Sequence, residues 1–257
     1  MSSFMKKAKS GALGIGAVAI AAALAFGSSV DSPITDVVKD FLPSTDSGSF
    51  SAQSTESDQF LTHDGKAVIE YDVKPGEIVY EGVDNHGRAQ AVYSSLTTEI
   101  RAEAKERGRG GNPEDTNADP AGWGHNEKVT IEYPSGGTYT GWFWNRSHLL
   151  ADSLGGKAAA DAWVTGTRTQ NVGRNDGKGG MAYTETIARK FLDDTNNANC
   201  PLYYAAVPNY KGSELVPRNV TVDIQSCDKS IDERVTVDNV MPGYEINYMD
   251  GSFRESQ

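Results

Sequence analysis

The chain has 257 residues, enough for one large domain or two small ones, and its 38% hydrophobic content is that of an ordinary globular protein. Taken alone, a formal net charge of −11 at pH 7 argues against a nucleic-acid-binding protein, because such binding depends on Lys and Arg displacing counterions. The sequence contains no Walker loop, no H-E-x-x-H zinc motif and no G-x-S-x-G elbow, which excludes several enzyme classes.

Residues 1–27 have the pattern of an export signal. Lys6, Lys7 and Lys9 precede an uncharged run over residues 11–26, and residues 25–27 (Ala-Phe-Gly) are typical of a cleavage site. The alternative is an uncleaved membrane anchor, since the 16-residue run is just shorter than a membrane-spanning helix. Either interpretation predicts that the rest of the chain faces the outside of the cell. Cleavage removes three lysines and no acid, so the net charge changes from −11 to −14.

The remainder divides into a linker and one domain. Residues 28–60 are rich in Ser, Asp and Thr and have too few apolar groups to offset the entropy of ordering, which predicts a disordered linker. Residues 61–257 then form the predicted globular domain. Strands are expected at residues 67–71, 77–80, 128–133, 138–144, 202–207 and 219–225, and helices at 94–106 and 180–193. Strands and helices mix without β-α-β alternation, which favours the α+β class.

Cys200 and Cys227 are the two cysteines of the chain. In an exported protein a lone pair is more often a disulfide than a metal site. The strands expected at 202–207 and 219–225 lie beside these cysteines, so antiparallel pairing of the strands would bring the two thiols together. A bridge there would add about 3 kcal/mol of stability.

Residues 141–190 form a basic region in an otherwise acidic chain, with seven basic and four acidic side chains. A local site for an anionic ligand therefore stays open despite the overall charge. The region begins with the aromatic-rich end of a predicted β-hairpin, whose strands flank the Pro-Ser-Gly-Gly turn at residues 134–137. The second strand of the hairpin leads into the sequence Asn145-Arg146-Ser147-His148.

His148 has two interpretations, because an isolated histidine is more often structural than catalytic. Its setting favours a working role: Arg146 can bind phosphate, the strand end fixes the direction of the imidazole, and the polar loop leaves it open to water. Ser147 as a nucleophile is disfavoured. No acid is placed to complete a triad, and adjacent residues of a strand point to opposite sides.

Two further patterns also leave alternatives open. Asn171, in the glycine-rich stretch 165–180, could cap a turn or helix, or could offer a neutral amide oxygen to a hard ion such as Mg²⁺. Glu185 and Arg189 are four residues apart on the predicted helix. They could form an ordinary surface ion pair, or Glu185 could orient the waters of a metal while Arg189 holds phosphate oxygens.

Taken together, four phrases resemble the DNA/RNA non-specific endonucleases, the ββα-metal or His-Me finger nucleases, and among them the secreted streptodornase-type branch. The phrases are GWFWNRSHLLADSLGG, VTGTRTQNVG, GGMAYTETIARKFL and YKGSELVPRNVTVDIQS, in that order along the chain. The resemblance covers roughly residues 119–251. It implies a central antiparallel sheet flanked by helices.

The resemblance also implies roles for individual residues. The D-R-G-H motif of the family corresponds to residues 145–148, so His148 would be the general base and Arg146 a phosphate ligand. Asn171 would bind Mg²⁺, with Mn²⁺ as a substitute, and Glu185 and Arg189 would match a Glu-x-x-x-Arg pattern on the following helix. Asn145 and Ser147 depart from the commoner Asp and Gly, so their roles do not follow from the family.

The expected activity is hydrolysis of DNA and RNA, without sequence preference, to products with a 5′-phosphate. Additional basic residues are candidates for contacts with the nucleic-acid backbone: Arg168, Arg174, Lys178 and Arg218. Rates should rise with pH through an ordinary histidine titration near pH 6 to 7, roughly. The sequence indicates no stable protein partner. The alternatives are an anchored DNA-uptake or toxin nuclease with the same chemistry, and a non-catalytic module that binds nucleic acid.

Overall fold

The structure, a computed structural model, describes residues 60–257. The predicted export signal at residues 1–27, with its anchor alternative at 11–26, lies outside the described residues, as does the predicted linker except for its last residue. Within residues 60–257, no helix is both long enough and apolar enough to cross a membrane.

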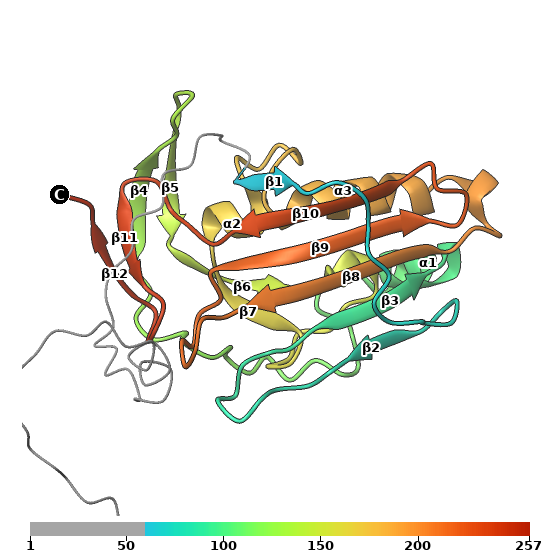
Figure 1. The fold of residues 1–257 in the computed structure, drawn as a ribbon, viewed down its shortest axis with the longest axis horizontal. Coiled ribbons are helices and arrows are strands. Elements are labelled where there is room, and N and C mark those ends of the chain that lie inside the picture. The colour runs from blue at the N-terminus through green and yellow to red at the C-terminus, as the bar shows by residue number, and fades with distance from the viewer. Residues whose placement is uncertain (1–59) are drawn as a thin grey trace, which may run out of the picture. The chain divides into compact units, whose positions relative to one another are not determined.

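A six-stranded sheet forms the largest element of the domain. Its strands follow the order β1-β10-β9-β8-β3-β2, and all neighbouring strands are antiparallel (Figure 1). Their bounds are β1 Leu61–His63, β2 Ile78–Tyr80, β3 Val92–Leu96, β8 Leu202–Asn209, β9 Asn219–Ser226 and β10 Asp232–Asp238. The strands predicted at 77–80, 202–207 and 219–225 are confirmed, as is the α+β class.

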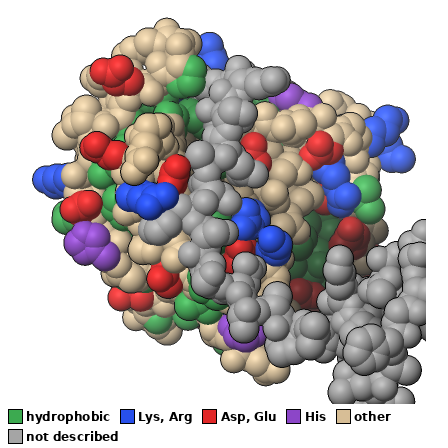
Figure 2. Space-filling model, turned by 60° about the vertical axis from the view of Figure 1, so that its left-hand side comes forward, with side chains coloured by type: hydrophobic (Ala, Val, Ile, Leu, Met, Phe, Trp, Pro, Cys, Tyr) green, Lys and Arg blue, Asp and Glu red, His purple; other side chains and the backbone are tan. Residues whose placement is uncertain are grey.

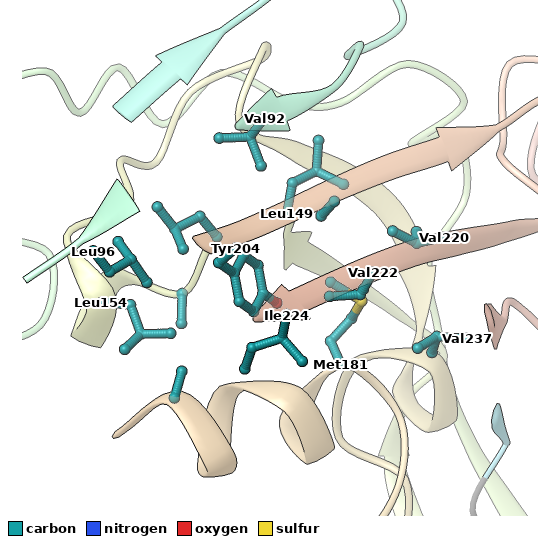
Figure 3. Close-up of a cluster of buried hydrophobic side chains, with 14 of the residues drawn as sticks. Val92, Leu96, Leu149, Leu154, Met181, Tyr204, Val220, Val222, Ile224 and Val237 are labelled. Carbon is teal, nitrogen blue, oxygen red and sulfur yellow. The ribbon is translucent and has the colours of Figure 1, made fainter. Parts of the chain in front are cut away.

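Strand alternation divides the sheet into two apolar faces. On β8, Leu202, Tyr204 and Ala206 belong to the main core, whereas Ala205 belongs to a small cluster on the opposite face. The main core lies between the sheet and helix α3, Met181–Leu192, and Figure 3 shows Met181 among the valines of the sheet. The predicted helix 180–193 is confirmed, and the predicted apolar face is buried at every position: Met181, Thr184, Ala188, Phe191 and Leu192.

The predicted helix 94–106 is wrong at its start. Residues Val92–Leu96 form β3 in the middle of the sheet, and helix α1 spans Thr98–Arg107. The side chain of Thr97 caps α1 by accepting a hydrogen bond from the Ile100 amide at 3.4 Å. Leu96 and Ile100 have the four-residue spacing of a helix, but Leu96 lies in the strand and Ile100 in the helix. The spacing therefore does not reveal where the strand ends.

The strand predicted at 67–71 is also wrong. The backbone amides of Ala67 and Val68 donate to the carboxylates of Asp232 and Asp223, at 3.2 and 2.7 Å, in place of a strand partner. The edge position beside β10 is taken by β1 instead. Residues 67–71 therefore run as irregular chain that is held to the sheet by side-chain carboxylates.

Three two-stranded ribbons complete the strands: β4 Lys128–Glu132 with β5 Thr138–Trp142, β6 Trp144–His148 with β7 Trp163–Thr167, and β11 Tyr244–Asn247 with β12 Ser252–Glu255. The predicted β4–β5 hairpin is confirmed. Its second strand ends at Trp142, and the buried Phe143 separates it from β6. The motif at residues 145–148 therefore lies inside a strand of a second ribbon. The short elements are α2 Arg168–Val172, η1 Asp152–Leu154 and η2 Thr195–Asn197.

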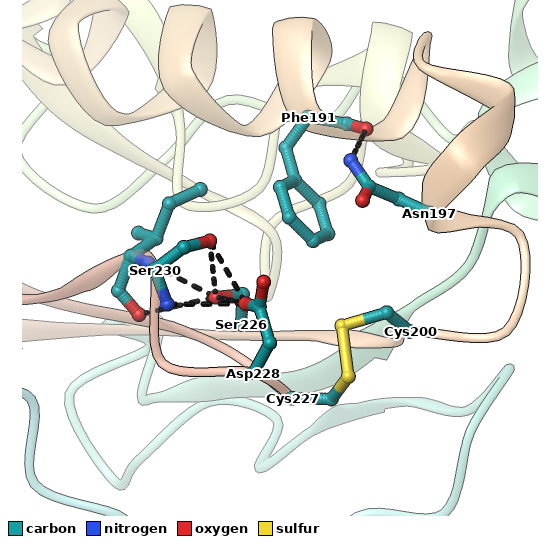
Figure 4. The surroundings of a disulfide bond; sticks show 8 residues. Phe191, Asn197, Cys200, Ser226, Cys227, Asp228 and Ser230 are labelled. Carbon is teal, nitrogen blue, oxygen red and sulfur yellow. Dashed lines mark hydrogen bonds between the residues drawn. A yellow bond between two sulfur atoms is a disulfide. The ribbon is translucent and has the colours of Figure 1, made fainter.

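Cys200 and Cys227 form a disulfide (Figure 4). The two cysteines flank the paired ends of β8 and β9, where Leu202 lies opposite Ser226. The Cys227 amide donates to the Pro201 carbonyl oxygen at 3.1 Å, so the backbone pairing extends up to the bridge.

Asn239 joins the β6–β7 ribbon to the rest of the domain. Its side chain is fully buried, and its Oδ1 accepts from the Thr167 amide at 2.8 Å. Its Nδ2 donates to the carbonyl oxygens of Thr165 at 3.0 Å and Pro217 at 2.8 Å. One side chain thus satisfies three backbone groups that would otherwise be buried without partners.

We expect Asn239→Ala to lower the free energy of unfolding by about 3 kcal/mol, because it leaves these backbone groups unpaired in the interior. Equilibrium urea denaturation measures the change. Asn196→Ala is the matched control, since the Asn196 amide is exposed and bonds within its own turn to Asp194. Equal midpoints for the two variants would contradict the assigned role of Asn239.

Candidate active site

The β6–β7 ribbon presents the residues of the 145–148 motif to two sides. In the antiparallel register, His148 lies opposite Trp163 and Arg146 opposite Thr165. Arg146 and His148 share one side of β6 because strand residues alternate, and Asn145 and Ser147 share the other. The imidazole of His148 packs edge-on against the indole of Trp163, with 5.3 Å between ring centroids.

Asn171 is held by the two motif residues whose roles did not follow from the family. Its Nδ2 donates to Asn145 Oδ1 at 3.2 Å, and its Oδ1 accepts from the Ser147 hydroxyl at 3.3 Å. Asn171 does not cap α2, because Thr167 does so by accepting from the Gln170 amide at 3.0 Å. Ser147 is fully buried, so a nucleophilic role for it is excluded.

Glycines fix α3 against α2. Gly180 precedes α3 with φ of 60°, and a Cβ there would lie 2.6 Å from backbone atoms of Thr169, Gln170 and Gly173. No other residue fits this close backbone approach without displacement. The glycines of the 165–180 stretch therefore do more than make turns, because they set the position of Glu185 relative to Asn171.

Glu185 and Arg189 form an ion pair, with 3.5 Å between Glu185 Oε2 and Arg189 Nη1. Burial raises the pKa of Glu185 to about 7, and the charge of Arg189 opposes that rise. Arg189 also donates to the hydroxyls of Ser153 at 3.3 Å and Thr186 at 2.8 Å. The pair lies in the wall of a cavity, so it differs from an ordinary surface pair.

The imidazole of His148 is mostly enclosed. Among residues 60–257, its Nε2 is buried and has no hydrogen-bond partner. Burial lowers the pKa of His148 below 6.5, Asp152 opposes this shift, and Arg109 adds to it. A neutral imidazole can accept a proton from a bound water.

Two adjoining cavities meet at His148. The smaller, about 450 Å³, brings together all five residues predicted for catalysis and metal binding: Arg146, His148, Asn171, Glu185 and Arg189. The larger, about 810 Å³, shares Arg146, His148 and Asn171 with it and extends to the end of the β4–β5 hairpin. These five side chains come from one strand and two helices, so elements distant in sequence converge on one site.

Arg146 is exposed and forms an ion pair with Asp119, whose Oδ1 lies 3.0 Å from Arg146 Nε. The guanidinium stacks over the indole of Trp123, at 4.6 Å from the ring centroid. An exposed ion pair contributes little stability, so an entering phosphate can replace Asp119 at low cost.

The four predicted backbone contacts do not share one location. Arg168 lines the larger cavity and stacks over Tyr139 at 5.1 Å. Arg174 instead donates to the Gly136 carbonyl oxygen at 2.8 Å, at the β4–β5 turn, and Arg218 donates to Glu214 at 2.8 Å. Lys178 is exposed in the loop before α3 and lines neither cavity.

Basic and acidic side chains are interspersed over the face drawn in Figure 2, which agrees with the acidic composition. The smaller cavity, by contrast, is lined by more basic than acidic side chains. This distribution favours an anionic ligand bound at one place.

Sequence reasoning missed Arg109 and Asp152, which line both cavities. Asp152 accepts from Arg107 at 3.2 Å and from the Gly110 amide at 3.0 Å, so it fixes the loop that carries Arg109. The signal was the run Arg-Gly-Arg-Gly-Gly at residues 107–111. An arginine between two glycines of positive φ lies on a backbone that can approach a ligand closely.

The donor set suits a divalent ion with few protein ligands. No group of three or more His, Cys, Asp or Glu side chains that could hold a metal occurs within residues 60–257. The smaller cavity offers the amide oxygen of Asn171 and the carboxyl of Glu185. Such a sparse set of hard oxygens matches an ion that keeps most of its waters and takes other ligands from a substrate.

Comparison with known proteins shows the family to which the chain belongs. Residues 53–248 match the DNA/RNA non-specific endonuclease family, and the chain belongs to that family. A deoxyribonuclease of Streptococcus dysgalactiae subsp. equisimilis is 33% identical over 216 residues, which cover 73% of this chain and 63% of that protein. The chain thus spans less than two thirds of the length of this relative.

Solved structures share the fold. The Sda1 nuclease, determined with a bound zinc ion, has a TM-score of 0.69 and 30% identity, covering 78% of this chain and 98% of its own. NucA from Streptococcus agalactiae, determined with magnesium, has a TM-score of 0.57 and 22% identity, covering 76% and 90% respectively.

We expect Asn145→Ala to weaken divalent-metal binding by about 10- to 100-fold, because the amide of Asn171 loses the acceptor that orients it. Titration calorimetry with Mg²⁺ and with Mn²⁺ measures the affinity. Asn145→Asp retains an acceptor at the same place and should bind metal at least as tightly as the native protein. Equal losses in both variants would contradict an orienting role.

Proposed function

We propose that this protein is an exported, divalent-metal-dependent endonuclease that hydrolyses DNA and RNA without sequence preference. The observation that carries the proposal is the smaller cavity, which gathers a histidine, the amide of Asn171, a carboxyl group and two arginines. Membership of the endonuclease family supports the same reaction.

His148 acts as the general base. Its largely buried imidazole stays neutral at neutral pH, and the ring lines the smaller cavity, where it accepts a proton as water attacks the phosphorus atom. The edge of Trp163 keeps the ring in place, so the base is positioned before substrate arrives.

Asn171 and Glu185 would hold the metal ion, Asn171 directly and Glu185 through water. A bound Mg²⁺, or Mn²⁺ in its place, would neutralise charge on the phosphate and on the departing 3′ oxygen, which leaves a 5′-phosphate product. A neutral amide ligand leaves the charge of the ion available for this purpose. Asn145 and Ser147 keep the amide of Asn171 directed into the cavity.

Arg146 and Arg189 hold the phosphate from two sides of the cavity. Arg189 is already restrained by Glu185, Ser153 and Thr186, so it loses little freedom on binding. Arg168 extends contact along the backbone of the nucleic acid. Contacts to phosphate carry no sequence information, which accounts for cleavage without sequence preference.

Two variants test the reaction. We expect His148→Ala to reduce plasmid cleavage by about 10² to 10⁴-fold, because the general base is lost. Asn171→Ala should be similarly impaired, and EDTA should abolish cleavage by the native protein. Gel assays of supercoiled plasmid with the purified domain measure these rates.

Lys211→Ala serves as the control, because its exposed side chain lies outside both cavities. Its rate should stay within about twofold of the native rate. Metal-independent cutting, or full activity of His148→Ala, would overturn the mechanism. Binding of DNA that survives EDTA, with no cutting in any metal, would instead identify a non-catalytic module.

The pH profile follows from the burial of His148. Because its pKa is lowered from 6.5, the neutral base predominates at pH 6.5, and activity is lost only as the pH falls through that lowered value. The loss of activity at low pH should therefore be centred below pH 6.5 rather than near pH 7. Single-turnover rates of Glu185→Gln, which lacks the cavity's other group with a shifted pKa, should keep this loss of activity at low pH. A loss that disappears in Glu185→Gln would assign the titration to Glu185 instead.

A further inference from the structure

All four tryptophans of the chain line the larger cavity beside His148: Trp123, Trp142, Trp144 and Trp163. Tyr139 adds a fifth aromatic side chain to the same lining. The catalytic roles proposed above require only one of these rings, Trp163, which packs against His148. The gathering of the others at this cavity calls for a separate function.

The four indoles divide into two pairs. Trp144 and Trp163 are buried, and their Nε1 groups donate to the carbonyl oxygens of Gly251 at 2.9 Å and Ala118 at 2.8 Å. They form the wall of the cavity. Trp142 is 52% exposed, and Trp123 is half-buried, so these two rings present accessible surface to a ligand.

Cations alternate with the aromatic rings. Arg146 lies 4.6 Å from the ring centroid of Trp123, Arg168 lies 5.1 Å from that of Tyr139, and Lys128 lies 5.7 Å from that of Trp142. Aromatic faces interleaved with positive charges are what a single nucleic-acid strand requires, since its bases stack and its phosphates need cations. The volume of about 810 Å³ is that of a typical small-molecule site and accommodates a nucleotide.

We propose that this cavity is a stacking site for an unpaired nucleobase of the strand being cut. This inference rests on the proposed nuclease function, because Arg146 and His148 line both the larger cavity and the smaller one where the phosphate binds. In an intact duplex the faces of each base are covered by its neighbours, and a base must be extruded before an indole can stack on it. The protein therefore binds single-stranded DNA or RNA, and locally opened duplex, more tightly than intact duplex.

The test compares binding of one sequence in two forms, a 20-nucleotide single strand and the same strand in a blunt duplex. His148→Ala provides a cleavage-impaired background, and filter binding in EDTA gives the dissociation constants. We expect Trp142→Ala in this background to weaken single-strand binding by about tenfold and duplex binding by less than twofold. Trp142→Phe should keep most of the single-strand affinity, because phenylalanine still offers a ring to stack on.

The matched control is Tyr71→Ala, which removes an aromatic side chain of similar exposure, 48%, away from both cavities. It should change neither affinity. Equal losses on single strand and duplex in Trp142→Ala, or tighter binding of the duplex by the background protein, would overturn the stacking site. Plasmid cleavage by the native protein separates the two proposals. If the plasmid is cut but the binding assay shows no preference for the single strand, the nuclease function stands and only this inference fails.

Discussion

The buried amide of Asn239 is the interaction on which the site depends most. It bonds to both ends of a short stretch of β7, at Thr165 and Thr167, and to Pro217 beside the main sheet. Because α2 follows β7 directly, this contact also fixes the position of Asn171. The stability of the domain and the position of Asn171 are therefore coupled through one side chain.

Further contacts position the other residues of the site. Asn145 and Ser147 orient Asn171, the contact of Gly180 with α2 fixes the start of α3, and α3 carries Glu185. Burial acts on two titratable groups of the smaller cavity by favouring their neutral forms, because it lowers the pKa of His148 and raises that of Glu185 to about 7.

Sequence alone predicted the α+β class, the β4–β5 hairpin, helix α3 and the strands beside the cysteines, because each has a clear apolar period or turn signal. It failed at Leu96, where one spacing spans a strand and a helix, and at residues 67–71, where pairing depends on which segment occupies the sheet edge. The five residues predicted for the site do line one cavity. Contacts such as that of Asp152 with the loop of Arg109 have no local signature, since they join segments more than 40 residues apart.

The gathering of the tryptophans has an optical consequence. Because every indole of the chain lines one cavity, the intrinsic ultraviolet emission of the folded protein originates there. Trp142, the most exposed of them, faces solvent and emits from a wetter environment than Trp144 and Trp163. A ligand that covers it changes the colour and yield of that emission, so the protein reports occupancy of its own cavity without any added label.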